Sequence, residues 1–116
     1  EVLDALKPIA PLHAIRGNND RGAWAKKLPD TKRISIGGTK LFLIHDVHDL
    51  DFDPSERGVA VVISGHSHRP SIIERDGVLF VNPGSAGPRR FKLPVAVGKL
   101  RIADGKLRAE VVELHI

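Results

Sequence analysis

Two histidines separated by one residue follow an apolar run near the middle of the chain, and they are well suited to binding a metal. The run from Val59 to Ile63 contains only β-branched or small residues, which is typical of a strand buried on both faces. Gly65 ends this strand, and His66 and His68 follow. In an extended segment alternate side chains share a face, so the two imidazoles are predicted to point the same way. Neutral imidazole is the commonest metal ligand, although the same spacing also fits two solvated histidines.

Two other apolar runs also end in polar groups that could bind a metal or a phosphate. His45 follows the run 41–44, and the sequence 17–20, Gly-Asn-Asn-Asp, follows the run 12–15. In open α/β sheets, ligands bind beyond the carboxyl ends of the strands. The three strand ends are therefore predicted to form one site at the same edge of a sheet.

Composition limits the chemistry that this site can use. The chain has 116 residues, of which 41% are hydrophobic, enough for a single core that buries about two thirds of the unfolded surface. It contains no cysteine, so disulfides and thiolate metal sites are excluded. Any transition metal must therefore be bound through nitrogen and oxygen atoms.

The charge balance suits an anionic ligand but not a stable complex with nucleic acid. Eighteen basic and 14 acidic residues give a net charge of +4, and the basic residues are scattered. Aromatic residues make up only 4% of the chain, which disfavours stacking on single-stranded nucleic acid. No apolar run approaches a membrane span and no signal segment opens the sequence, so we expect a cytoplasmic protein without a membrane partner.

The remaining pattern predicts an α/β domain in which hairpins flank the central strand. Pro8 is expected to end an opening helix, another short helix is expected at 22–27, and a helical turn near 55–57 is expected to be capped by Asp53 or Ser55. The alternating apolar runs predict a strand at 12–16 and three hairpins, formed by 33–36 with 40–45, 71–74 with 78–82, and 95–102 with 107–114.

Four motifs resemble a known family. The segments 16–20, 43–46, 65–70 and 81–85 look like the later motifs of the calcineurin-like metallophosphoesterase superfamily, closest to its small YfcE-type phosphodiesterases. The motifs occur in the family's order over nearly the whole chain, which is far more specific than any one of them. The resemblance implies a single domain over 1–116 that forms part of a four-layer αββα sandwich with mixed sheets.

The resemblance also implies roles for individual residues around two divalent metal ions. Such a centre polarises a phosphoryl group and lowers the pKa of bound water. Mn²⁺ is expected first, with Ni²⁺, Fe²⁺, Co²⁺ or Zn²⁺ as alternatives. The implied residues are Asn18, His45 and His66 as ligands of one metal, His68 as a ligand of the other, and Asn19 as a catalytic residue. Separately from the resemblance, Arg89 and Arg90 are expected to bind the substrate phosphate, although surface arginines usually have no such role.

The sequence departs from the family pattern in three places. The family's Asp-x-His and Gly-Asp motifs, which supply a carboxylate that bridges the metals, are absent. Asn19 stands where many members have histidine, and Asp46 stands where glycine is common. We therefore expect the sequence to represent the C-terminal portion of the domain. Alone it should hold at most one weakly bound metal and be inactive, and an exposed sheet edge could form a homo-oligomer.

Three further segments are expected to have structural roles. The segment 82–85 is predicted to hold the loop shape beneath the metal edge, and His13 is predicted to be packed within a strand. The acidic segment 46–53 lacks the glycine and the closing glutamate of an EF-hand, so it is interpreted as a solvated loop.

Two classes of function fit the sequence. One is a metal-dependent phosphoesterase that hydrolyses a small-molecule phosphate ester, with a diester expected before a monoester. The other is a non-catalytic interaction scaffold, because the same superfamily contains a retromer subunit that uses the fold as a binding surface. The four predicted metal ligands favour the enzyme, since a scaffold does not need them.

Overall fold

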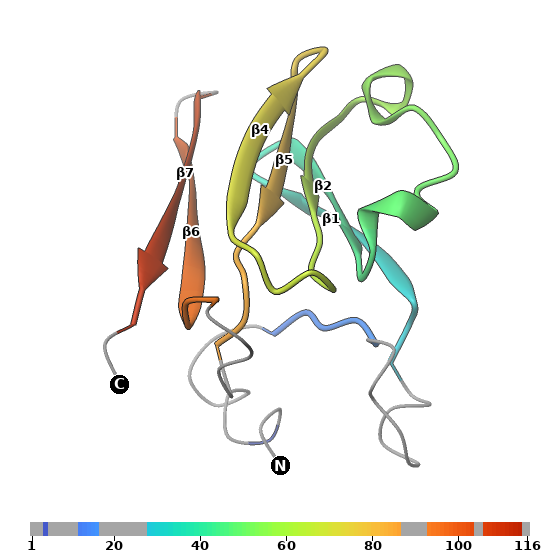
Figure 1. Ribbon diagram of the computed structural model, residues 1–116. Helices are drawn as coiled ribbons and strands as arrows, with labels where there is room; N and C mark the ends of the chain where they lie inside the picture. Colours follow the sequence, from blue (N-terminus) through green and yellow to red (C-terminus); the bar gives the residue numbers. More distant parts are fainter. Residues whose placement is uncertain (1–3, 5–11, 17–27, 87–92, 104–105, 115–116) are drawn as a thin grey trace.

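The computed structural model describes residues 4, 12–16, 28–86, 93–103 and 106–114. Seven strands form a five-stranded sheet in the order β1-β2-β3-β5-β4 and a two-stranded sheet of β6 and β7 (Figure 1). The strands are β1 (Thr31–Ile36), β2 (Thr39–Ile44), β3 (Val59–Ile63), β4 (Ser71–Arg75), β5 (Val78–Asn82), β6 (Ala96–Ala103) and β7 (Lys106–Glu113).

The central strand β3 is buried on both faces, as its sequence predicts. It pairs in parallel with β2 and β5, and Val61 and Val62 are both 0% exposed. Because neighbouring residues of a strand point to opposite faces, these two valines anchor two separate apolar clusters. The antiparallel strands β1 and β4 complete the sheet at its two edges, so the first two predicted hairpins are confirmed.

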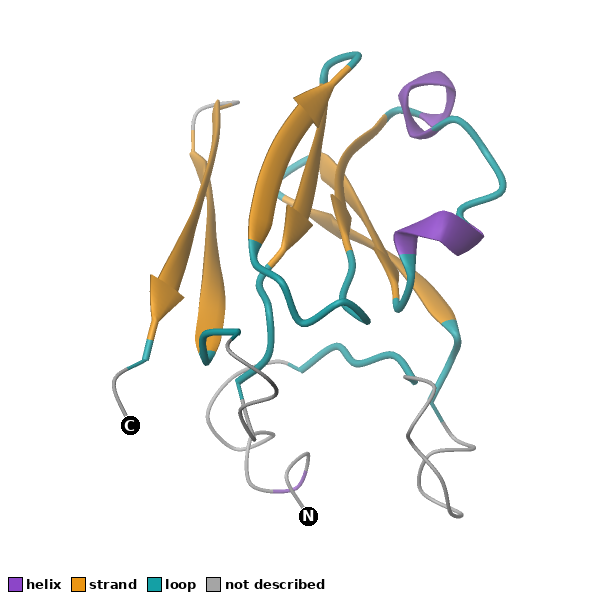
Figure 2. Ribbon diagram, viewed as in Figure 1, coloured by secondary structure: helices purple, strands orange, loops and turns teal. Residues whose placement is uncertain are grey.

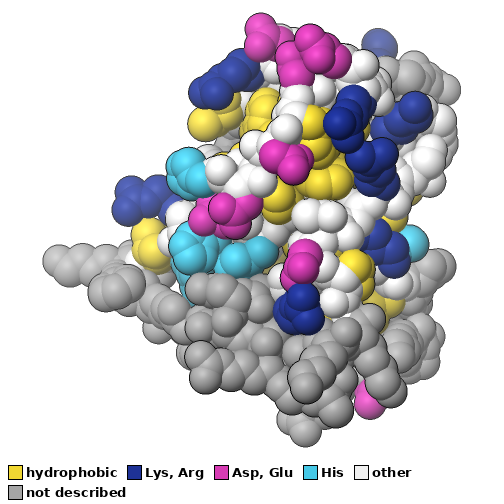
Figure 3. Space-filling view, turned by 90° about the vertical axis from the view of Figure 1, so that its right-hand side faces the viewer, with side chains coloured by type: hydrophobic (Ala, Val, Ile, Leu, Met, Phe, Trp, Pro, Cys, Tyr) yellow, Lys and Arg dark blue, Asp and Glu magenta, His cyan; other side chains and the backbone are white. Residues whose placement is uncertain are grey.

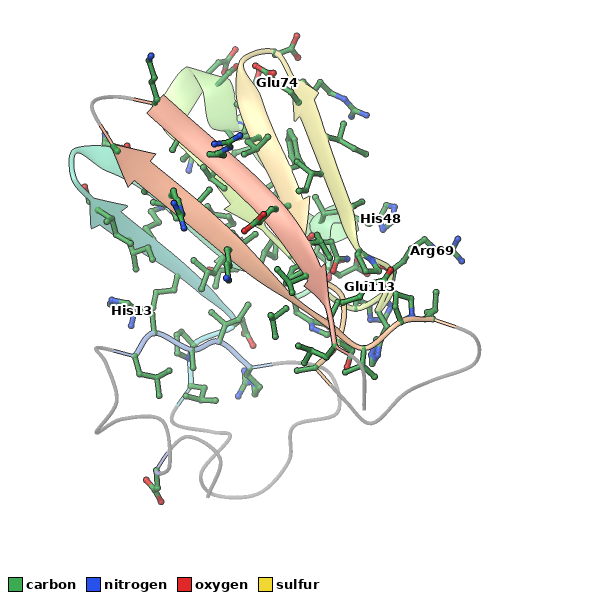
Figure 4. All side chains as sticks on the ribbon, turned by 90° about the vertical axis from the view of Figure 1, so that its left-hand side faces the viewer. His13, His48, Arg69, Glu74 and Glu113 are labelled. Atoms are coloured by element: carbon green, nitrogen blue, oxygen red, sulfur yellow. The ribbon has the colours of Figure 1, made fainter. Side chains whose placement is uncertain are left out.

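The hairpin of β6 and β7 covers one face of the five-stranded sheet. Leu41, Val61 and Val81 pack there against apolar side chains of the hairpin. Figure 4 shows the two layers packed face to face. These layers are the two sheets of the predicted sandwich, which confirms the mixed α/β fold. The hairpin residues in this cluster are Leu100, Ile102, Leu107 and Ala109.

The opposite face is covered in part by the connection between β2 and β3. Two short 3₁₀ turns lie in this connection, η1 (Val47–Asp49) and η2 (Pro54–Arg57) (Figure 2). Asp53 caps η2 by accepting a hydrogen bond from the Ser55 N–H at 3.0 Å, which selects Asp53 from the two predicted caps. The turn η1 was not predicted, because the acidic segment was interpreted as a loop.

An aromatic pair fastens this connection to the sheet. The rings of Phe42 and Phe52 meet edge to face with their centroids 4.9 Å apart. The guanidinium of Arg57 lies 4.4 Å from the Phe52 ring centroid, within the range of a cation–π contact. Phe52 is therefore the side chain through which η2 is held near the core.

The prediction of a strand at residues 12–16 is wrong. The segment is extended and lies at the end of the sheet where β2, β3 and β5 finish (Figure 1), but no described strand pairs with it. The Arg16 N–H donates to the Pro29 carbonyl at 2.8 Å, and its side chain contacts Asp30. His13 is exposed rather than packed. The helix expected at 22–27, and the opening helix apart from Asp4, lie outside the described residues.

We predict that Phe52→Ala lowers the free energy of unfolding by about 1–3 kcal/mol, because it removes a partly buried ring from the Phe42 contact. Urea unfolding monitored by circular dichroism measures the change. Glu56→Ala, an exposed change in the same turn, is the control and should alter stability by less than about 0.5 kcal/mol. Equal stability of the two variants would show that Phe52 does not anchor the connection.

Candidate metal centre

The carboxyl ends of the three parallel strands bring distant loops together. His45 follows β2, and the segment 64–70, here called the histidine loop, follows β3. The Gly65 N–H donates to the His45 carbonyl at 2.8 Å, and the Ser64 N–H donates to the Val81 carbonyl at 2.9 Å. The predicted convergence is therefore confirmed for the ends of β2 and β3, whereas residues 17–20 lie outside the described residues.

His45 and His66 face each other across this edge. Nε2 of His45 lies 3.2 Å from Nδ1 of His66, and the two rings are inclined at 80°. Metal–nitrogen bonds of about 2.0–2.1 Å would place two ligands of one ion roughly 3.0 Å apart in an octahedral site and 3.4 Å apart in a tetrahedral one. The observed separation therefore fits two ligands of a shared cation.

Asp46 lies on the other side of the His66 ring. Its Oδ2 is 3.7 Å from Nε2 of His66, while Oδ1 accepts a hydrogen bond from the His48 N–H at 3.1 Å. This backbone hydrogen bond is the main cause that lowers the pKa of Asp46, and His48 and His66 lower it further. An ionised carboxylate beside Nε2 favours the tautomer protonated there, which leaves the Nδ1 lone pair directed toward His45.

The histidine loop is not extended, so the predicted alternation of its side chains is wrong. His66 and His68 have φ angles of +68° and +60°, in the left-handed region that non-glycine residues seldom occupy. Nδ1 of His68 is buried and has no hydrogen-bond partner among the described residues. A strained backbone and an unsatisfied buried nitrogen are both common at ligand sites. This geometry is consistent with a ligand for His68 that is not a protein atom.

Asn82 holds the histidine loop in this conformation. This side chain at the end of β5 is only 8% exposed. Its Nδ2 donates to the Gly65 carbonyl at 3.0 Å and to Ser67 Oγ at 3.1 Å, and its Oδ1 accepts from the Gly84 N–H at 2.9 Å. The predicted role of segment 82–85 beneath the metal edge is confirmed for its first residue.

Gly84 is required by the close approach of the two loops. Its φ angle is +81°, and a Cβ at this position would lie 2.8 Å from Cγ of Pro70. No real Cβ tolerates that separation, so one of the two backbones would have to move. The histidine loop and the loop after β5 therefore pack as one unit.

The structure places some predicted site residues together and does not describe others. Asn18, Asn19, Arg89 and Arg90 lie outside the described residues. Within the described part of the chain, no three His, Asp or Glu side chains form a group that could hold a metal. Of the predicted ligands, the structure brings only His45 and His66 into contact, and the complete ligand set stays a prediction.

His48, which belongs to the acidic segment 46–53, also lies near the histidine pair. Nδ1 of His48 lies 2.9 Å from Asp46 Oδ1. Figure 3 shows histidine and acidic side chains gathered on the side that carries η1 and η2. In Figure 4, His48 and Arg69 lie near the histidine loop, whereas His13 lies well apart from them. The sequence does place His48 two residues after Asp46. An aspartate that caps a turn accepts a hydrogen bond from the backbone two residues later, which brings that residue close to it.

Comparison with known proteins identifies the family. The model of the calcineurin-like phosphoesterase superfamily domain matches residues 1–105. The chain belongs to this superfamily. The match covers the two parallel strands whose ends carry His45 and His66, so the histidine pair lies within a domain of phosphoesterase type.

Individual relatives agree with this assignment. The chain is 34% identical to a probable metallophosphoesterase of Methanothermobacter thermautotrophicus, over 97% of the chain and 68% of the relative. It is 26% identical to a predicted phosphoesterase structure from Streptococcus pneumoniae, with a TM-score of 0.69, over 85% of the chain and 60% of that structure. The chain thus spans about two thirds of these relatives.

A further structure of similar fold was determined with a metal. Vps29 of Entamoeba histolytica, complexed with Zn²⁺, is 25% identical to the chain, with a TM-score of 0.70, over 96% of the chain and 74% of that structure. Superfamily membership implies divalent metal ions, and the spacing of His45 and His66 fits one. In the described part of the chain, no helix is long and apolar enough to cross a membrane.

We predict that His45→Ala and His66→Ala each weaken metal binding by more than tenfold, because each removes one nitrogen of the facing pair. Calorimetric titration of the purified protein with Mn²⁺ gives the affinity. His13→Ala is the matched control, since this histidine is exposed and distant from the pair. Loss of metal binding in the His13 variant would contradict the site.

We predict that Asn82→Asp weakens Mn²⁺ binding by about 10–100-fold, the usual effect of losing a partner that orients a ligand. A carboxylate there cannot donate to the Gly65 carbonyl and is repelled by it, so the histidine loop loses this hydrogen bond. Titration should be combined with circular dichroism to verify that the sheet remains folded. Unchanged affinity in a folded variant would mean that the loop holds its shape without Asn82.

Proposed function

We propose that the protein is a metal-dependent phosphoesterase that hydrolyses small-molecule phosphodiesters in preference to monoesters. The observation that carries this proposal is the contact of His45 with His66, 3.2 Å apart, at the ligand-binding edge of a calcineurin-like phosphoesterase domain. The preference for diesters rests on the resemblance to the YfcE-type members.

The ligand set proposed for the metals is Asn18, His45, His66 and His68, and the cations are proposed to be a pair, with Mn²⁺ first among the candidates. Amide oxygen and imidazole nitrogen suit divalent transition metals. When bound, such ions supply positive charge to the phosphoryl oxygens and lower the pKa of water. Neutral ligands preserve this charge, which favours binding of an anionic ester.

The protein's own side chains would orient the ester and its leaving group. Arg89 and Arg90 are proposed to bind the phosphate through charge-assisted hydrogen bonds. Asn19 is proposed to donate a hydrogen bond to charge that develops on the leaving oxygen, since an amide can donate but cannot transfer a proton. A cytoplasmic location, a homo-oligomer and a single domain that lacks its N-terminal part also stay predictions.

The second candidate is a non-catalytic interaction scaffold of the same fold. The edge strand β4 favours it, because Ile72 and Ile73 of this strand are 39% and 52% exposed. Exposed apolar side chains on an unpaired edge are features of surfaces that bind other chains. The facing histidines favour the enzyme, since a binding surface gains nothing from them.

We predict that the whole protein, supplied with Mn²⁺, hydrolyses bis-p-nitrophenyl phosphate, and that His66→Ala lowers kcat/KM by more than about 100-fold. Release of p-nitrophenol measures both. Changing a residue that only orients a ligand usually lowers activity by at most about 10–100-fold. The loss of kcat/KM in His66→Ala should exceed that range. Protein that binds two Mn²⁺ ions without any turnover above buffer would favour the scaffold.

A further inference from the structure

A cavity of about 460 Å³ lies next to the histidine loop on the face of the sheet that carries η1. Asp46, Gly65 and His66 line the end nearest the histidine pair. Farther from the histidine pair, apolar side chains line the cavity, and the guanidinium of Arg75 lies at its other end. The residues of this second part are Val47, Leu50, Ile73, Phe80 and Arg75.

The strand register explains why these side chains share the cavity. In the antiparallel pairing of β4 with β5, Ile73 lies opposite Phe80 and Arg75 lies opposite Val78. Directly opposed residues point to the same face. Phe80 packs against the cluster that includes Phe42, so Ile73 and Arg75 lie on the face that carries η1.

The connection between β2 and β3 covers only part of this face. Its Val47, Leu50 and Phe52 pack on the cluster formed largely by β2 and β3. Ile73 on the edge strand remains 52% exposed. Among the described residues, an apolar surface beside the metal edge is therefore left open to a ligand.

The charges at the two ends of the cavity are opposite. Asp46 lines the end near the histidine pair, whereas Arg75 lies at the far end of β4. No described carboxylate forms an ion pair with Arg75. Ser71, which also lines the cavity, is four residues before Arg75, and four strand steps span about 13 Å. A second anionic group on a ligand would therefore be attracted to the Arg75 end.

We propose that this cavity binds one of the two ester groups of the phosphodiester substrate, and that Arg75 binds a second anionic group on it. The proposal rests on the proposed function. The substrate class is a phosphodiester in which a planar or apolar group separates the scissile phosphate from another negative charge. Phe80, Ile73 and Leu50 would contact the apolar part, and Arg75 would set the preference for the charge.

The test compares two substrates of matched shape. Both are p-nitrophenyl phosphodiesters of a biphenyl alcohol, one with a 4′-carboxylate and the other with its 4′-methyl ester. The carboxylate should be hydrolysed with the higher kcat/KM. Arg75→Gln should reduce the ratio of the two values by about 2–5-fold, the effect of one solvent-exposed ion pair.

Two further variants make the result specific. Arg101→Gln, on β6 in the other sheet, should leave the ratio unchanged, and Arg75→Lys should retain part of it. An equal effect of Arg75→Gln on both substrates, or no effect on the ratio, would overturn the proposal. If no diester is hydrolysed even with Mn²⁺, the proposed function fails. Equilibrium titration with the same two compounds then decides whether the cavity still selects the carboxylate through Arg75.

Discussion

The parallel pairing of β3 with β2 and β5 is the constraint on which the site depends. Leu41 pairs with Val61 on one side, and Val62 pairs with Phe80 on the other. A shift of one residue would exchange the faces on which Val61 and Val62 are buried, and both apolar clusters would lose their centre. The register that buries the valines thereby also fixes where the strands end. That common end, rather than any long-range attraction between imidazoles, places His45 beside His66.

The histidine loop is held in a conformation that its own residues disfavour. Left-handed backbone at His66 and His68 costs about 1–3 kcal/mol for each residue. The two hydrogen bonds that the buried Asn82 makes to this loop return about 0.5–1.5 kcal/mol each, which offsets part of that cost. Gly84 also lies so close to Pro70 that a side chain would not fit between the two loops. The site is thus formed by a strained loop and a rigid neighbour, and neither would hold the imidazoles in place alone.

The sequence predicted the features that arise from local patterns. The β-branched run of β3, the hairpin turns at 37–38 and 76–77 and the Asp53 cap each depend on neighbouring residues, and the structure confirms them. The strand expected at 12–16 was wrong because a strand also needs a partner for its backbone, which sequence pattern does not reveal. The left-handed conformation of His66 and His68 was missed for a similar reason. It is stabilised by Asn82, 16 and 14 residues later in the chain, whereas the expected alternation assumed an extended backbone.

The charge distribution links metal binding to substrate binding. The facing pair, His45 and His66, brings no negative charge, and the nearest carboxylate, Asp46, is 3.7 Å from the ring nitrogen that faces away from the pair. Asp46 is already engaged by the His48 backbone, so it would neutralise a bound cation only in part. The remaining positive charge would be balanced best by an anionic phosphate ester. Because binding free energies are reciprocal, an ester attracted by the cations must strengthen their binding by the same factor. For the ligands proposed from this chain, the metal and the ester would therefore each strengthen the binding of the other.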